Sequence, residues 1–102
     1  MADVDVLMIA TVVVEEHVSF DLATLCRASG AHAHQVHALV DEGLLQPTGQ
    51  GPDAWRFGGE ALPQTRQALR LAREFDLDLP AVALVMDLMA QIEQLRASLR
   101  GR

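Results

Sequence analysis

The sequence predicts a mainly α-helical domain with a helix-turn-helix, short strands at the N-terminus and in a wing, and a C-terminal amphipathic helix. Three observations support this fold class. Leu, Ala and Val must fill the interior, because the chain has one Trp, three Phe and no Tyr, and this composition favours packed helices. A Ser-Gly pair separates two short segments of helical periodicity. The last segment places apolar residues at alternating spacings of three and four.

The bulk composition describes one small domain. Two cores of independent stability would not fit in 102 residues, and the hydrophobic half of the chain is enough to bury one core. A single cysteine, Cys26, excludes an internal disulfide and a cysteine-built zinc site. The apolar run at residues 6–14 follows acidic residues and is too short to span a bilayer, so we expect a soluble, cytoplasmic protein.

The N-terminal part of the chain is expected to contain a strand and the first helix of the helix-turn-helix. Residues 6–14 (VLMIATVVV) are rich in β-branched side chains, which is typical of a short buried strand. We expect the helix-turn-helix over residues 19–47. Its first helix begins with Ser19 as N-cap, carries Asp21 in its first turn and ends at the Ser-Gly pair at residues 29–30.

The second helix and the wing follow this turn. Residues 33–42 have helical periodicity, and Gly43 supplies the C-terminal stop. The wing is predicted over residues 48–58, which begin with a loop rich in Gly and Pro. The alternating triplet at residues 55–57 (WRF) then indicates a half-buried strand, which can pair with the N-terminal strand.

Two longer helices complete the predicted domain. The third spans residues 60–75 and is expected to turn Phe75 toward the core, and the fourth spans residues 80–100. The fourth carries an apolar seam through which we predict a homodimer: Val85, Leu88, Ile92, Leu95 and Leu99. A second stripe on this helix is expected to pack inward: Val82, Met86 and Met89. The alternative is that both stripes fold back onto the third helix within one chain.

Three segments resemble the N-terminal half of MerR-type regulators. Residues 40–47 (VDEGLLQP) look like the EGLL-x-P turn that follows the second helix of those proteins. Residues 55–57 look like their aromatic-Arg-aromatic wing strand. Residues 69–79 (LRLAREFDLDL) resemble the segment that leads into their dimer helix. The resemblance implies a MerR-like winged helix-turn-helix.

Within that superfamily, the closer resemblance is to the CbpM family of chaperone modulators. Residues 25–30 (LCRASG) look like the end of the first helix in that family. Residues 68–80 (ALRLAREFDLDLP) resemble its A-x-R-L-x-x-E-L-x-L-D-W-P segment, although Leu79 stands where the family has Trp. Residues 82–95 fit its apolar tail.

The resemblance to CbpM implies that the chain binds the J-domain of a DnaJ-like, CbpA-type co-chaperone and inhibits its work with a DnaK-type chaperone. J-domains present a basic helix to their chaperone, so a chain with a net charge of -6 is a sensible competitor. The residues that we expect to carry the contact are Asp41, Glu42, Trp55, Glu60, Glu74, Asp76 and Asp78.

The alternative function is that of a MerR-type DNA-binding transcriptional regulator. On that hypothesis Arg56, Arg66 and Arg70 would contact the DNA backbone. A solvated face is the plainer interpretation, because Arg70 and Glu74 have the i,i+4 spacing of an ion pair. The second helix has no Arg or Lys and ends in two carboxylates, which would face phosphate. We therefore do not expect nucleic-acid binding.

No pattern in the sequence indicates an enzyme, a cofactor or a metal site. His32, His34 and His37 cluster near the second helix, but no carboxylate or second Cys stands at ligand spacing in that segment. Cys26 has apolar neighbours on its helix face and is expected to be a buried, inert thiol. Paired carboxylates, a Gly-rich phosphate loop and a Ser/His/Asp set are all missing from the sequence.

Overall fold

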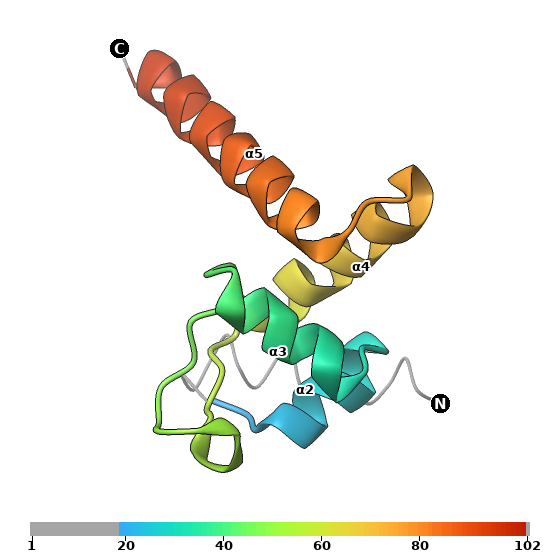
Figure 1. Ribbon diagram of the computed structural model, residues 1–102. Helices are drawn as coiled ribbons and strands as arrows, with labels where there is room; N and C mark the ends of the chain where they lie inside the picture. The colour runs from blue at the N-terminus through green and yellow to red at the C-terminus, as the bar shows by residue number, and fades with distance from the viewer. Residues whose placement is uncertain (1–18, 102) are drawn as a thin grey trace.

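Four α-helices and one 3-10 turn make up the regular structure of residues 19–101, the part of the chain that the computed structural model describes. They are α2 (Leu22–Ser29), α3 (Ala33–Asp41), η1 (Pro52–Ala54), α4 (Ala61–Phe75) and α5 (Leu79–Arg100). The mainly α-helical fold class is confirmed. α2, α3 and α4 pack into one body, and α5 leaves it as a long arm (Figure 1). The strand predicted over residues 6–14 lies outside the described residues.

The start of α2 differs from the expected one. Asp21 is its N-cap, because the Asp21 Oδ1 accepts a hydrogen bond of 2.9 Å from the Thr24 N–H. The same bond lowers the pKa of the Asp21 carboxyl, since it stabilises the charged form. The prediction of Ser19 as N-cap is wrong because Phe20 stays extended. Phe20 exchanges backbone hydrogen bonds of 3.0 and 2.9 Å with Phe57 and buries its ring.

A tight turn joins α2 to α3. Gly30 caps α2 with a φ of 82°, a left-handed conformation that favours glycine, and its N–H donates to the Cys26 carbonyl at 2.9 Å. The Ser29 hydroxyl donates to the Leu25 carbonyl at 2.6 Å and accepts from the Ala31 N–H at 3.2 Å. The Ser-Gly pair therefore ends the first helix as predicted, and α2 and α3 form the helix-turn-helix.

The wing contains isolated antiparallel bridges in place of the predicted strand. Thr48 and Arg56 exchange two backbone hydrogen bonds of 3.0 Å, and Phe57 pairs with Phe20. Successive residues of the wing triplet thus pair with different segments, so no ladder extends along it. Gly49 closes the loop before η1 with a φ of 98°, at a point where an added Cβ would overlap a backbone oxygen of η1.

The core lies where α2, α3, α4 and the wing meet. Its fully buried side chains come from all of these elements, from the segment after α3 and from the start of α5: Leu25, Val36, Leu39, Leu45, Phe57, Thr65, Ala68 and Val82. Arg66 on α4 donates to the Ala28 carbonyl near the end of α2 at 3.0 Å, which ties the two helices together. Phe57, 1% exposed, is the largest of the fully buried side chains and fixes the wing to the body.

α5 enters the core with its first two turns and then leaves it. Val82 is fully buried and Met86 is 8% exposed, whereas Met89 is 42% exposed. The inward packing predicted for Met89 is therefore wrong, because the body ends one turn earlier. Residues 87–100 are all exposed, so α5 does not fold back onto α4 (Figure 1). Phe75 is also exposed rather than part of the core, since the last turn of α4 extends past the body.

The buried Thr65 provides a test of this core. Its hydroxyl has no hydrogen-bond partner within the described residues, although the side chain is fully buried. Thr65→Val keeps the shape and removes the unpaired hydroxyl, so we expect it to raise the free energy of unfolding by about 1 kcal/mol. Guanidinium unfolding followed by circular dichroism measures this. Thr65→Ser is the control: it keeps the hydroxyl, loses the methyl group and should lower stability. A destabilised Thr65→Val variant would contradict the packing described.

Candidate partner-binding surface

The acidic residues predicted to bind a partner are all exposed, but they occupy three separate places on the body. The end of α3, the start of α4 and the joint between α4 and α5 hold them: Asp41 and Glu42, then Glu60, then Glu74, Asp76 and Asp78. Glu60 and Glu74 lie at opposite ends of α4, about 20 Å apart at the rise of an α-helix. The predicted set is therefore not a single cluster.

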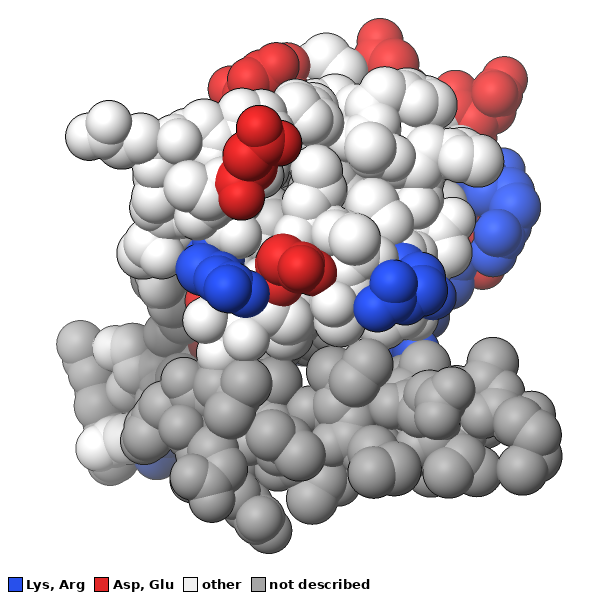
Figure 2. All heavy atoms as spheres, turned by 90° about the horizontal axis from the view of Figure 1, so that it is seen from below, with Lys and Arg blue, Asp and Glu red and all other residues white. Residues whose placement is uncertain are grey.

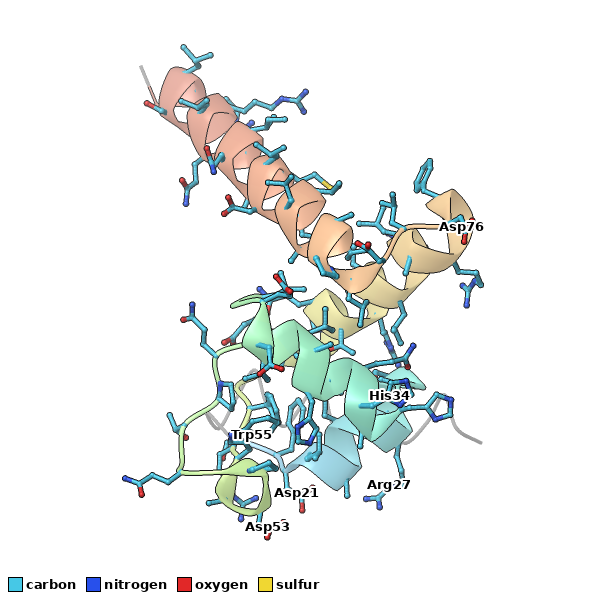
Figure 3. The ribbon with its side chains drawn as sticks, viewed as in Figure 1. Asp21, Arg27, His34, Asp53, Trp55 and Asp76 are labelled. Carbon is cyan, nitrogen blue, oxygen red and sulfur yellow. The ribbon has the colours of Figure 1, made fainter. Side chains whose placement is uncertain are left out.

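The joint between the last two helices, which we call the α4–α5 corner (residues 74–79), is the densest of the three. Asp76 has a left-handed φ of 52° and ends α4, with its N–H donating to the Ala72 carbonyl. Asp78 caps α5, because its Oδ1 accepts from the Ala81 N–H at 2.9 Å. Asp76 lies at the tip of the corner, away from the rest of the body (Figure 3). The capping role of Asp78 was missed, although the Leu-Pro pair that follows it indicates a helix start.

Trp55 is half-buried where the wing meets α3 (Figure 3). The centroid of its ring system lies 4.8 Å from that of His37 and 5.9 Å from that of Phe57, the latter in edge-to-face geometry. Trp55 therefore anchors the wing and offers only part of its surface to a partner.

The rings of His32 and His34 stack with centroids 5.6 Å apart. Within residues 19–101, no three metal-ligating side chains of the His, Cys, Asp or Glu type come together.

An open groove, which the sequence did not predict, lies between the end of α3, α4 and the first half of α5. We call it the α3–α5 groove, and its volume is about 770 Å³. Its lining combines apolar, acidic and neutral polar residues without Arg or Lys: Glu42, Gly43, Leu44, Gln64, Gln67, Pro80, Ala83, Leu84, Met86, Asp87, Met89, Ala90 and Glu93. One feature of the sequence could have pointed to this groove: Asp87 and Glu93 are close in the chain to Met86 and Met89 on α5.

The two carboxylates that α5 contributes to this groove have weak partners. Asp87 accepts a hydrogen bond of 2.8 Å from the Gln91 amide, and Glu93 pairs with Arg100 at 3.0 Å. Both members of the Glu93–Arg100 pair are about two-thirds exposed, so water screens the attraction. Both carboxylates can therefore exchange these contacts for a partner's cation at little cost.

The surface that DNA would have to contact lacks a continuous basic patch. α3, the second helix of the helix-turn-helix, contains no Arg or Lys. Arg66 is engaged with the Ala28 carbonyl. On the face in Figure 2, carboxylates are interspersed among the Arg side chains. In the described part of the chain, Arg70 and Glu74 do not form the ion pair that their spacing allows.

Comparison with known proteins identifies the family. Residues 20–101 match the family described as MerR HTH family regulatory protein. The chain is 35% identical over 80 residues to the chaperone modulatory protein CbpM of Pseudomonas putida strain GB-1, covering 78% of this chain and 79% of the relative. The chain belongs to the CbpM family. It is also 32% identical to CbpM of Pseudomonas entomophila strain L48, with the same coverage, and 25% identical over 93 residues to CbpM of Coxiella burnetii strain Dugway 5J108-111, covering 91% of this chain and 88% of the relative.

Membership in the CbpM family confirms the resemblance found in the sequence, and the MerR family match confirms the MerR-like fold class.

In this CbpM-family chain, Cys26 is half-buried rather than buried, and burial raises the pKa of its thiol. A raised pKa lowers the fraction of reactive thiolate at neutral pH. Among the residues described, no helix has the length and apolar character needed to cross a membrane.

Proposed function

We propose that this CbpM-family chain is a chaperone modulator that binds the J-domain of a DnaJ-like, CbpA-type co-chaperone and inhibits its work with a DnaK-type chaperone. The observation that carries the proposal is the similarity to proteins named chaperone modulatory protein CbpM over about four-fifths of both chains. The net charge of -6 supports it, since a basic J-domain helix is the complementary partner.

The α4–α5 corner is the surface that we propose for this contact. Phe75 projects there with 63% of its surface exposed, directly between Glu74 and Asp76 in the chain. An exposed aromatic ring flanked by carboxylates offers a partner both apolar area and charge, a combination that suits a basic helix with apolar side chains. The other predicted contacts, at the end of α3 and the start of α4, remain part of the proposal as secondary surfaces.

Charge removal at the corner tests this surface. The triple variant Glu74→Lys, Asp76→Asn and Asp78→Asn reverses one negative charge and removes two. Asn tolerates the left-handed conformation at 76 and keeps the helix cap at 78. We expect it to weaken J-domain binding, measured by calorimetry, with a larger effect at low salt. Glu60→Lys, at the other end of α4, is the matched comparison. Unchanged affinity of the triple variant would remove the corner from the account, and weakening by Glu60→Lys alone would move the contact there.

We also propose that the chain forms a homodimer through α5. The seam residues beyond the body are between 48% and 69% exposed in the single chain: Leu88, Ile92, Leu95 and Leu99. Val85 is half-buried at the inner end of the seam. An apolar stripe of this length seldom stays uncovered in water. We expect an antiparallel or crossed arrangement with little charge pairing, because Gln91 and Arg96 are the polar residues beside the seam.

Ile92→Asp tests the dimer. Because Ile92 is 50% exposed and touches no part of the body, the variant should stay folded and helical while sedimenting as a monomer. Gln94→Asp is the control, since it adds the same charge on the opposite side of α5 and should leave the dimer intact. A wild-type chain that sediments as a monomer at all accessible concentrations would rule out the dimer, and unfolding of Ile92→Asp would show that this residue has core contacts.

A DNA-binding transcriptional regulator is the second candidate function, and the match to MerR HTH regulatory proteins favours it. It requires a dimer, a palindromic site and a salt dependence set by Arg56, Arg66 and Arg70. The absence of Arg and Lys from α3 argues against it, because that helix would have to read base edges in the major groove.

A further inference from the structure

The α3–α5 groove has a lining that is complementary to a basic amphipathic helix. Apolar side chains from two elements contribute to it, with Leu44 just after α3 and Met86 and Met89 on α5. Carboxylates come from the same two elements: Glu42, Asp87 and Glu93. No Arg or Lys lines the groove. A ligand that fits this pattern needs apolar groups at its centre and positive charges beside them.

The shape of the groove also favours a helix. It is open on one side, so that a helix can lie in it with one face buried and the other in water. Helices that dock into grooves place apolar side chains at i, i+3, i+4 and i+7, and acidic or basic residues beside them set the charge preference. Met89 is 42% exposed, and methionine side chains adapt their shape to the partner that covers them.

A second copy of this chain does not account for the groove. At about 100° per residue around a helix, Met86 and Glu93 lie on one side of α5, whereas Leu88, Ile92 and Leu95 of the proposed seam lie on nearly the opposite side. A dimer formed through the seam would therefore leave the groove open. A second acidic chain would also bring like charges to Glu42 and Asp87.

We propose that the α3–α5 groove receives a basic amphipathic α-helix of a partner protein. Its apolar side chains contact the exposed Met89 and the half-buried Leu44, next to the buried Met86, and its Lys or Arg side chains meet the three carboxylates. For the identity of the partner, the proposal rests on the proposed function, in which the basic helix belongs to a J-domain. Pro80 lines the groove and directly follows the α4–α5 corner in the chain.

A synthetic peptide tests the chemistry of the groove without a J-domain. The probe has about 18 residues, or five helical turns, with Leu at i, i+3, i+4 and i+7 and Lys elsewhere; a matched peptide carries Glu in place of Lys. The chain has four Met, so labelling of methionine methyl groups gives few signals, and Met89→Leu assigns one of them. We expect the Met86 and Met89 signals to shift to saturation with the Lys peptide and not with the Glu peptide.

Matched charge variants locate the binding. Asp87→Asn with Glu93→Gln removes two charges from the groove and keeps the side-chain shapes. Asp21→Asn with Asp53→Asn removes two charges outside it, and Asn keeps the helix cap at 21. By fluorescence anisotropy we expect about fivefold weaker peptide binding for the groove pair and a change within about twofold for the control pair. Equal weakening by both pairs, or Met86 and Met89 signals that do not move, would overturn the proposal.

A titration of the labelled chain with a J-domain separates the two proposals. In one outcome, the Lys peptide shifts the Met86 and Met89 signals while no J-domain binds. That result would support the groove proposal and contradict the proposed function. If a J-domain binds while Met86 and Met89 do not respond, the proposed function stands and the inference is overturned. Signals that shift on dilution of the chain alone would assign the groove to a second copy, which also overturns it.

Discussion

The hydrogen-bonded corner between α4 and α5 determines which surfaces this chain offers to other molecules. Asp76 turns the backbone with a positive φ, and the Leu77 N–H donates back to the last turn of α4 at 3.0 Å. Asp78 then starts α5 in a new direction. α5 is buried against the body only at Val82 and Met86, so its remaining turns face water or another molecule. The exposed Phe75, the α3–α5 groove and the apolar seam all follow from this geometry.

The charge distribution explains why a helix-turn-helix can serve protein contact here. The fold itself specifies no ligand. In this chain α3 lacks basic side chains, and Arg66 holds α4 to α2. Asp41 and Glu42 end the helix that would approach phosphate, and together with a net charge of -6 they oppose that approach. In the proposed function the same carboxylates would attract a basic protein helix, so the scaffold would be kept while its surface favours a different partner.

Local signals predicted most of the helices, and long-range contacts explain what they missed. The observed bounds of α3, α4 and α5 fall within one residue of those expected, because glycine, proline and capping residues act on their neighbours. The start of α2 was misplaced because Phe20 pairs with Phe57, a contact that no local pattern reveals. The acidic residues proposed as contacts are exposed, but no local pattern shows that they lie in three separate places. The groove was missed because it forms only where α3, α4 and α5 meet.

The central claim is that this acidic helix-turn-helix domain binds a J-domain and not DNA. Isothermal titration calorimetry of the full chain against an isolated J-domain, with a duplex from the upstream region of its own operon titrated under the same conditions, tests it most directly. The account predicts saturable binding to the J-domain that weakens as salt is raised, and no saturable binding to the duplex. Saturable binding to the duplex with none to the J-domain would contradict it.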